Sequence, residues 1–83
     1  MMYEIFLKEL ANYQLSQMYH EAEKEKGFDV EYHEKSANDS NLKWNAVRSI
    51  SKKILGNKVA MECSIEATKK AKEEFAKENF YIN

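Results

Sequence analysis

The clearest pattern of apolar and polar residues lies in the first third of the chain and predicts a long helix. From Met2 to about Lys26 there is no Gly or Pro, and polar residues recur every four positions from Glu4 to Lys24. An apolar row runs beside them and comprises Leu7, Ala11, Leu15, Met18 and Ala22. Rows at this spacing are typical of a helix with one buried face, and Gly27 follows as a C-terminal cap would.

The apolar sector of this helix is wider than a single stripe. Further large apolar residues flank the row over residues 2–19, namely Tyr3, Ile5, Phe6, Leu10, Tyr13 and Tyr19. A contiguous apolar surface usually marks a contact when it is exposed. We therefore expect either a central place in the core or a homodimer through this helix, with Leu15 and Met18 at the interface.

The following residues suggest strands. Residues 28–34 alternate apolar and polar positions, which predicts a half-buried strand with Phe28, Val30 and Tyr32 inward. The small polar residues of 36–41 predict a loop. Residues 59–65 alternate in the same way, and Leu55-Gly56-Asn57-Lys58 before them would be a hairpin turn.

Residues 42–54 fit a helix or a strand, whereas the last segment again predicts a helix. Residues 65–79 are rich in Ala, Glu and Lys, and Ala67, Ala71 and Phe75 form a narrow stripe. We therefore predict a single α+β domain over residues 1–83: a long N-terminal helix, a small antiparallel sheet of about three strands and a C-terminal helix. The alternative is an all-α three-helix protein in which residues 40–55 and 58–80 are both helices.

Length and composition limit the possible classes. A chain of 83 residues with 43% hydrophobic residues has enough for one small core, and its single Cys cannot form an intramolecular disulfide. We expect a cytoplasmic protein, because the chain shows neither a signal peptide nor an apolar run of about 20 residues.

Candidate catalytic and metal chemistry is sparse. Cys63 is far in the sequence from the two histidines, His20 and His33, and neither histidine belongs to a Cys or Asp cluster. Gly27 and Gly56 alone cannot form a glycine-rich phosphate loop. We expect no enzymatic activity, no metal and no cofactor.

Charge is distributed unevenly although the net charge is only −1. Residues 1–41 hold 4 Lys and 9 acidic residues, whereas residues 42–83 hold 9 basic and 5 acidic residues. The acidic segment, residues 21–39, contains Glu21, Glu23, Glu25, Asp29, Glu31, Glu34 and Asp39. Such a cluster could imitate a phosphate backbone and bind a basic, nucleic-acid-handling protein. We therefore expect a protein-binding inhibitor or regulator, similar in size and composition to the small acidic inhibitors that phages and mobile elements carry, anti-CRISPR proteins among them.

The basic half supports an alternative, a small nucleic-acid-binding module. Its candidate contacts are Trp44, Arg48, Lys52, Lys53, Lys58, Lys69, Lys70 and Lys72, with the tryptophan available to stack on a base. The expected order of helix, three strands and helix resembles the double-stranded RNA-binding domain, and residues 69–76 resemble the final helix of that family. This resemblance is one of layout and implies binding through the basic half.

Overall fold

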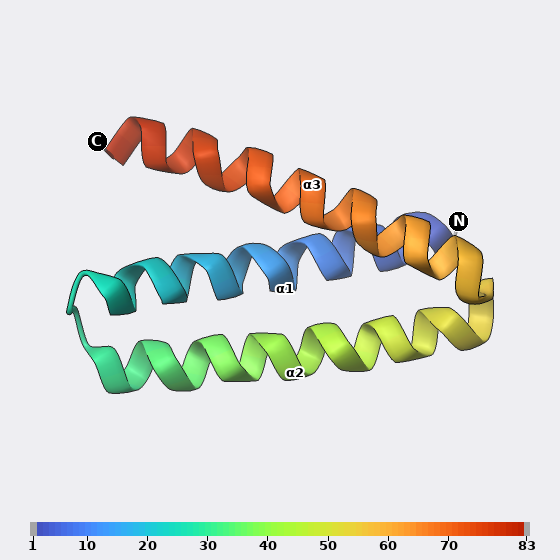
Figure 1. Cartoon of the computed structure of the whole chain (residues 1–83), viewed down its shortest axis with the longest axis horizontal. Helices are drawn as coiled ribbons and strands as arrows, with labels where there is room; N and C mark the ends of the chain where they lie inside the picture. Colours follow the sequence, from blue (N-terminus) through green and yellow to red (C-terminus); the bar gives the residue numbers. More distant parts are fainter. Residues whose placement is uncertain (1, 83) are drawn as a thin grey trace.

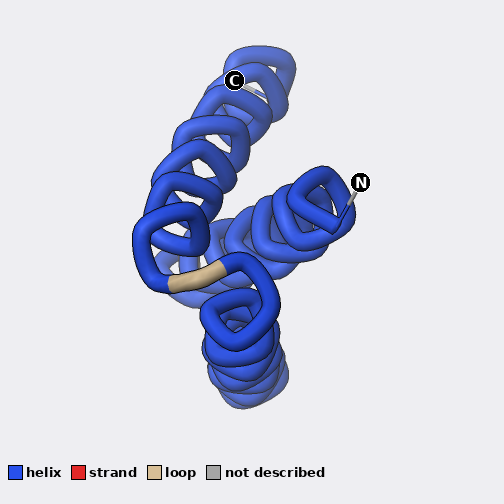
Figure 2. Tube along the Cα trace, turned by 90° about the vertical axis from the view of Figure 1, so that its right-hand side faces the viewer, coloured by secondary structure: helices blue, strands red, loops and turns tan. Residues whose placement is uncertain are grey.

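The computed structural model describes residues 2–82, with the side chains of residues 2–78, and consists there of three helices (Figure 1). They are α1 (Met2–Glu25), α2 (Val30–Leu55) and α3 (Asn57–Ile82). Helices α1 and α2 run antiparallel, side by side, along most of their length. Helix α3 turns back over the N-terminal half of α1 and then diverges from it. Seen from the end where α2 meets α3, the three helices do not form one flat layer (Figure 2).

The predicted sheet is wrong, because every described element is a helix. The supposed strand over residues 28–34 is the α1–α2 turn followed by the first turns of α2. The buried side of α2 has the spacing of a helix over its whole length and is formed by His33, Ala37, Ser40, Trp44, Val47, Ser51 and Leu55. Three of these seven residues are polar, so the spacing of hydrophobic residues in the sequence does not reveal this buried face of the helix.

The predicted loop and hairpin turn are also wrong. Residues 36–41 lie inside α2, where Ala37 and Ser40 face α1 and the remaining polar residues are largely exposed. Residues 58–65 belong to α3, where Ala60 and Cys63 are fully buried. The all-α alternative is thus confirmed as a fold class, but α2 begins ten residues earlier than expected. Because the described residues form no sheet, they do not have the order of helix, three strands and helix that resembled the double-stranded RNA-binding domain.

The first helix is confirmed, and its end has the predicted cap. Gly27 has a φ of +83°, in the left-handed region that glycine adopts readily. Its N–H donates to the Lys24 carbonyl at 3.0 Å, and the Phe28 N–H donates to the Glu23 carbonyl at 3.2 Å. These two bonds form a Schellman motif, which satisfies carbonyls at the helix end.

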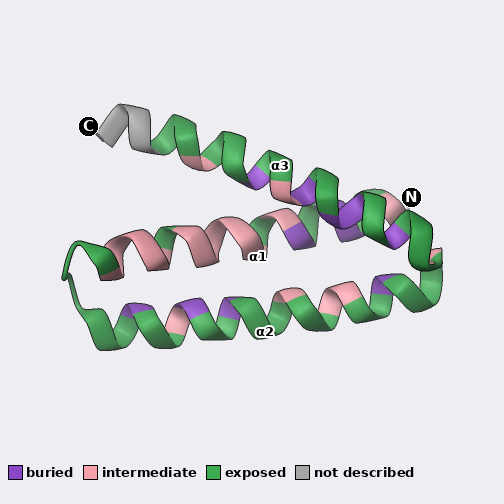
Figure 3. Cartoon of the chain, viewed as in Figure 1, coloured by how far each residue is buried: buried purple, intermediate pink, exposed green. Residues whose placement is uncertain are grey.

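The core lies where α3 crosses the N-terminal half of α1 (Figure 3). Phe6, Leu7 and Leu10 of α1 pack there against Cys63 and Ala67 of α3. The α3 residues at this crossing are small, which allows the two helices to approach closely. Partly buried residues surround the cluster, namely Tyr3, Ala11, Trp44, Val47 and Leu55.

A single residue, Gly56, connects α2 to α3. Its φ of +89° and ψ of +158° lie in a region that essentially only glycine occupies. The Gly56 N–H donates to the Lys52 carbonyl, and its own carbonyl accepts from the Ala60 N–H. The backbone therefore reverses direction here with its polar groups satisfied.

None of the three described helices combines the length and the apolar composition that crossing a membrane requires.

Candidate functional site

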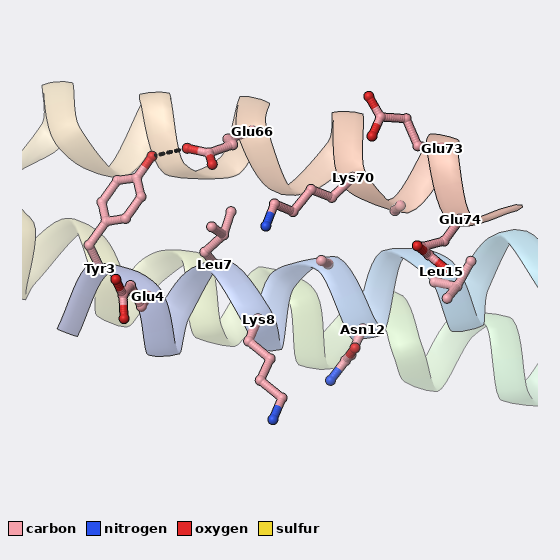
Figure 4. A pocket seen from close by; sticks show the side chains of 12 residues that line it. Tyr3, Glu4, Leu7, Lys8, Asn12, Leu15, Glu66, Lys70, Glu73 and Glu74 are labelled. Atoms are coloured by element: carbon pink, nitrogen blue, oxygen red, sulfur yellow. Dashed lines mark hydrogen bonds between the residues drawn. The ribbon is translucent and has the colours of Figure 1, made fainter. Parts of the chain in front are cut away.

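A groove of about 790 Å³ lies between α1 and α3, along the part of the molecule where they separate. Its apolar residues are Leu7, Ala11 and Leu15 of α1 and Ala71 of α3. Figure 4 shows Leu7 between the two helices, while Glu66 and Lys70 extend from α3 along the rim. The predicted apolar row of the first helix therefore lines an open surface beyond the core.

The narrow end of this groove is closed by a hydrogen bond. The Tyr3 hydroxyl donates to Glu66 Oε1 at 2.7 Å and so connects α1 to α3 (Figure 4). This bond to a carboxylate, followed by partial burial, raises the pKa of Tyr3 to about 12. Tyr3 therefore remains a neutral donor throughout the physiological range.

A second, separate hollow of about 370 Å³ lies further along α1, towards its C-terminal end. Met18 and Ala22 of α1 and Phe75 of α3 supply its apolar surface. Phe75 is only half-buried, because α3 has already moved away from α1 at this point. The two hollows succeed one another along α1 between Tyr3 and Glu25, and we refer to them together as the α1–α3 groove.

The lining of the α1–α3 groove is acidic. It contains six glutamates and two lysines, namely Glu4, Glu21, Glu25, Glu66, Glu73, Glu74, Lys8 and Lys70. The potential along an apolar, acid-lined groove favours a positively charged ligand.

The structure divides the predicted acidic segment between different surfaces. Glu21 and Glu25 line the α1–α3 groove, whereas Asp29, Glu31 and Glu34 are exposed at the α1–α2 turn and on the first turns of α2. Four of the seven acids lie within 4 Å of a lysine three or four residues away. These pairs are Glu21 with Lys24, Glu23 with Lys26, Glu31 with Lys35 and Asp39 with Lys43. The segment is therefore not one continuous anionic surface.

The fold brings together only some of the basic residues that were predicted to bind nucleic acid. Trp44 and Arg48 of α2 meet Lys69 and Lys72 of α3 around a pocket of about 520 Å³. Ser64, Ile65 and Thr68 complete this α2–α3 pocket, and no carboxylate of the described residues lines it. The remaining candidates lie elsewhere: Lys52, Lys53 and Lys58 are exposed near the α2–α3 connection, and Lys70 lines the α1–α3 groove.

Trp44 contacts both the core and Arg48. The indole is half-buried against the core, and the Arg48 guanidinium carbon lies 5.6 Å from the centre of its ring. This distance is typical of a cation–π contact. The arginine therefore occupies one face of the ring on which a base was expected to stack, while Trp44 still lines the α2–α3 pocket.

A histidine pair near the α1–α2 turn was missed at the sequence level. His20 Nδ1 and His33 Nδ1 are 2.8 Å apart, so one ring donates a hydrogen bond and the other accepts it. Burial, and then the proximity of His33, lower the pKa of His20, while Glu23 opposes this shift. Tyr19 and Tyr32 contact the pair edge-on. The two histidines are almost equally distant from Gly27, and this symmetry about a helical hairpin could have revealed them.

The described residues contain no group of three or more His, Cys, Asp or Glu side chains placed to hold a metal ion. Cys63 is fully buried, and its thiol donates to the Tyr3 carbonyl at 3.7 Å. Burial, and to a lesser degree Glu66, raise the pKa of this thiol, which lowers its reactivity as a nucleophile.

Searches against models of known protein families, against curated proteins and against solved structures found no match to this chain.

Proposed function

We propose that the protein is a non-enzymatic, protein-binding regulator that holds a basic amphipathic helix of its partner in the α1–α3 groove. The observation that carries this proposal is the acid-lined groove with an apolar floor, left open where α3 diverges from α1. Binding of an amphipathic helix in a hydrophobic groove is a recurring mode of protein recognition.

The dimensions of the groove fit a helical ligand. It follows α1 from Tyr3 to Ala22, which corresponds to about 28 Å and to a helix of about 18 residues. Apolar side chains spaced three and four positions apart on such a ligand would contact Ala11, Leu15 and Met18 in turn. Its polar side chains would then face the glutamates of the rim.

The charge of the rim supports a partner of the opposite sign. Glu73 and Glu74 on α3 and Glu21 and Glu25 on α1 flank the wide end of the groove. Lysines and arginines on the ligand would pair with Glu25 and Glu73 and would compete with Lys24 and Lys77 for Glu21 and Glu74. Charges of this sign would also accelerate association by electrostatic steering. Basic helices are common in proteins that bind nucleic acids, and for this reason we propose a nucleic-acid-handling protein as the partner.

A second copy of the chain would be the other occupant of the groove. In a two-fold dimer through Leu15 and Met18 the same surface of both copies would be in contact, so the glutamates of the two grooves would lie near one another and repel. This argument favours a foreign basic helix over the homodimer through Leu15 and Met18.

The test uses two synthetic helical peptides of about 18 residues. Both have Leu on one face; one has Lys and the other Glu at the remaining positions. We expect fluorescence anisotropy to show binding of the Lys peptide only, with tighter binding at low salt. The double substitution Leu15→Gln and Met18→Gln should weaken this binding at least about tenfold, because it removes two apolar contacts.

The matched control is the double substitution Leu42→Gln and Ile50→Gln, at side chains that are 67% and 50% exposed on α2 and lie outside the groove. It should leave the affinity unchanged. Equal binding of both peptides, or equal losses in the groove variant and the control, would overturn the proposal. A dimer in sedimentation equilibrium that the groove variant abolishes would instead assign the groove to a second copy.

A further inference from the structure

The α2–α3 pocket carries a second inference, which does not depend on the α1–α3 groove. We propose that this pocket binds the phosphate backbone of a nucleic acid. Arg48, Lys69 and Lys72 converge on it from two helices, and no carboxylate of the described residues shares the lining. A hollow with three cations and no anion has the electrostatic character of a phosphate site.

These cations form no salt bridge with the described residues of the protein. Within the described part of the chain, no acidic group lies within 4.0 Å of Arg48, Lys69 or Lys72 to form a salt bridge. By contrast, Lys24, Lys26, Lys35, Lys43 and Lys77 each have an acidic neighbour. The unpaired cations are therefore available to an external anion.

Arg48 is held in place without using its hydrogen-bonding capacity. It lies over the Trp44 ring, and its Nε is buried without a hydrogen-bond partner among the described atoms. The indole Nε1 of Trp44 is also buried and unpartnered. Because Nε is buried, the two terminal nitrogens of the guanidinium are the donors that would bind phosphate oxygens in a bidentate manner.

The arrangement favours a polymer with several phosphates over a single phosphate group. Lys52 lies one helical turn beyond Arg48 on α2, so the basic surface extends along the helix towards the α2–α3 connection. The Ser64 and Thr68 hydroxyls already donate to backbone carbonyls of α3, so the cations are the main donors at the site. Arg48 lies over the Trp44 ring, and no other aromatic side chain of the described residues lines the pocket, so we infer binding without sequence preference.

The experiment measures binding of fluorescently labelled single-stranded and duplex DNA and RNA of about 12 nucleotides to the full chain. Salt is varied from about 50 to about 200 mM. The test variant is Lys69→Gln with Lys72→Gln. The control is Lys35→Gln with Lys77→Gln, which changes the net charge equally at two exposed lysines that pair with their own helix. Circular dichroism confirms that both variants fold.

We expect binding that weakens with salt and does not depend on base sequence. The test variant should bind at least about fivefold more weakly, and the slope of log affinity against log salt should fall by about 1.4 for a single strand. The control should change neither quantity. No binding at the lowest salt, or equal losses in the two variants, would overturn the inference, as would tight binding of a phosphopeptide without binding of nucleic acid.

The groove variant Leu15→Gln with Met18→Gln separates this inference from the proposed function. These residues line the α1–α3 groove and not the α2–α3 pocket. The groove variant should therefore retain nucleic-acid binding. Loss of nucleic-acid binding in a folded groove variant would place the nucleic acid in the groove and would contradict the site that we assign.

Discussion

The histidine pair between α1 and α2 should make the stability of the folded protein depend on pH. His20 and His33 share one hydrogen bond between their Nδ1 atoms, which requires one of these nitrogens to lack a proton. Doubly protonated rings would both donate, and the bond would be lost. The packed histidines between α1 and α2 therefore favour the folded state most when His20 is neutral.

We predict that the free energy of unfolding falls as the pH is lowered from about 7.5 to about 5. The pKa of His20 is lowered in the folded state, so below its ordinary value of 6.5 the unfolded chain binds a proton that the folded chain does not. Urea unfolding at a series of pH values measures this effect. The variant His20→Gln should show a smaller decrease over the same range, and an identical decrease would contradict the assignment to His20.

The two glycines with positive φ should respond differently to substitution. Gly56 occupies a region that other residues essentially avoid, so Gly56→Ala should cost about 1–3 kcal/mol of stability. Gly27 lies in the left-handed helical region, and Gly27→Ala should cost about 1 kcal/mol. An added Cβ would meet no atom within 4 Å at either position, so the difference reflects backbone conformation alone. Thermal unfolding that shows equal losses would refute this explanation.

At the scale of elements, the contact between α1 and α3 depends on small side chains. Ala67 is fully buried against Phe6, Leu7 and Leu10. A larger residue there would push α3 away from α1, because overpacking a core typically costs about 1–3 kcal/mol. Cys63 can serve as a chemical probe of this contact, because its thiol is buried at the same crossing.

We predict that Ala67→Leu accelerates modification of Cys63 by a soluble thiol reagent. The wild-type thiol should react slowly under native conditions, because it is buried and its pKa is raised. The control is Ala76→Leu, at an exposed position of α3, which should leave the rate unchanged. A wild-type rate equal to that of the unfolded chain would show that α3 is not docked as described.

The helices differ in how well they could be predicted from the sequence. Helix α1 was predictable because its apolar row and its glycine cap are both explicit in the sequence. Helix α2 was not, because its buried side contains His33, Ser40 and Ser51, while Phe28 and Tyr32 are exposed and imitate a strand. Polar residues on that side find partners across the hairpin: Ser40 bonds Ser16 at 3.0 Å, and His33 bonds His20. Such pairing is a tertiary property that local periodicity does not contain.

The candidate surfaces were predictable to a similar degree. Leu15 and Met18 were expected at an interface, and both line the α1–α3 groove. The charged residues could be identified by type, but their grouping depends on which helices meet. Lys70 lines the acidic groove, whereas Lys69 and Lys72 line the basic pocket. These residues are neighbours in the sequence, and the packing of α3 against α1 and α2 places them on different surfaces.

The whole molecule has a small core and a large apolar surface. Many large apolar side chains remain exposed; Ile5, Phe28, Leu42 and Ile65 are each more than half exposed. A domain of this length buries a modest share of its surface, so its stability should respond strongly to a ligand that covers an apolar face.

We therefore predict that the Lys peptide raises the stability of the protein. At a peptide concentration about one hundred times its Kd, the gain should be about 2.7 kcal/mol, since the ligand binds only the folded state. Thermal unfolding with and without the peptide measures it. The Leu15→Gln, Met18→Gln variant should gain less at the same peptide concentration, and an equal gain would show that the peptide binds elsewhere.

The one-residue connection at Gly56 has a consequence for topology. If this residue took up helical dihedral angles, α2 and α3 would merge into one continuous helix, and α3 could no longer reach the α1 of its own chain. It could still dock on the α1 of another molecule through the same contacts, which is a domain swap. Since alanine favours the helical conformation that glycine resists, Gly56→Ala should populate a swapped dimer at high protein concentration. A chain that folds back through a single glycine is thus one substitution away from exchanging its third helix with a neighbour.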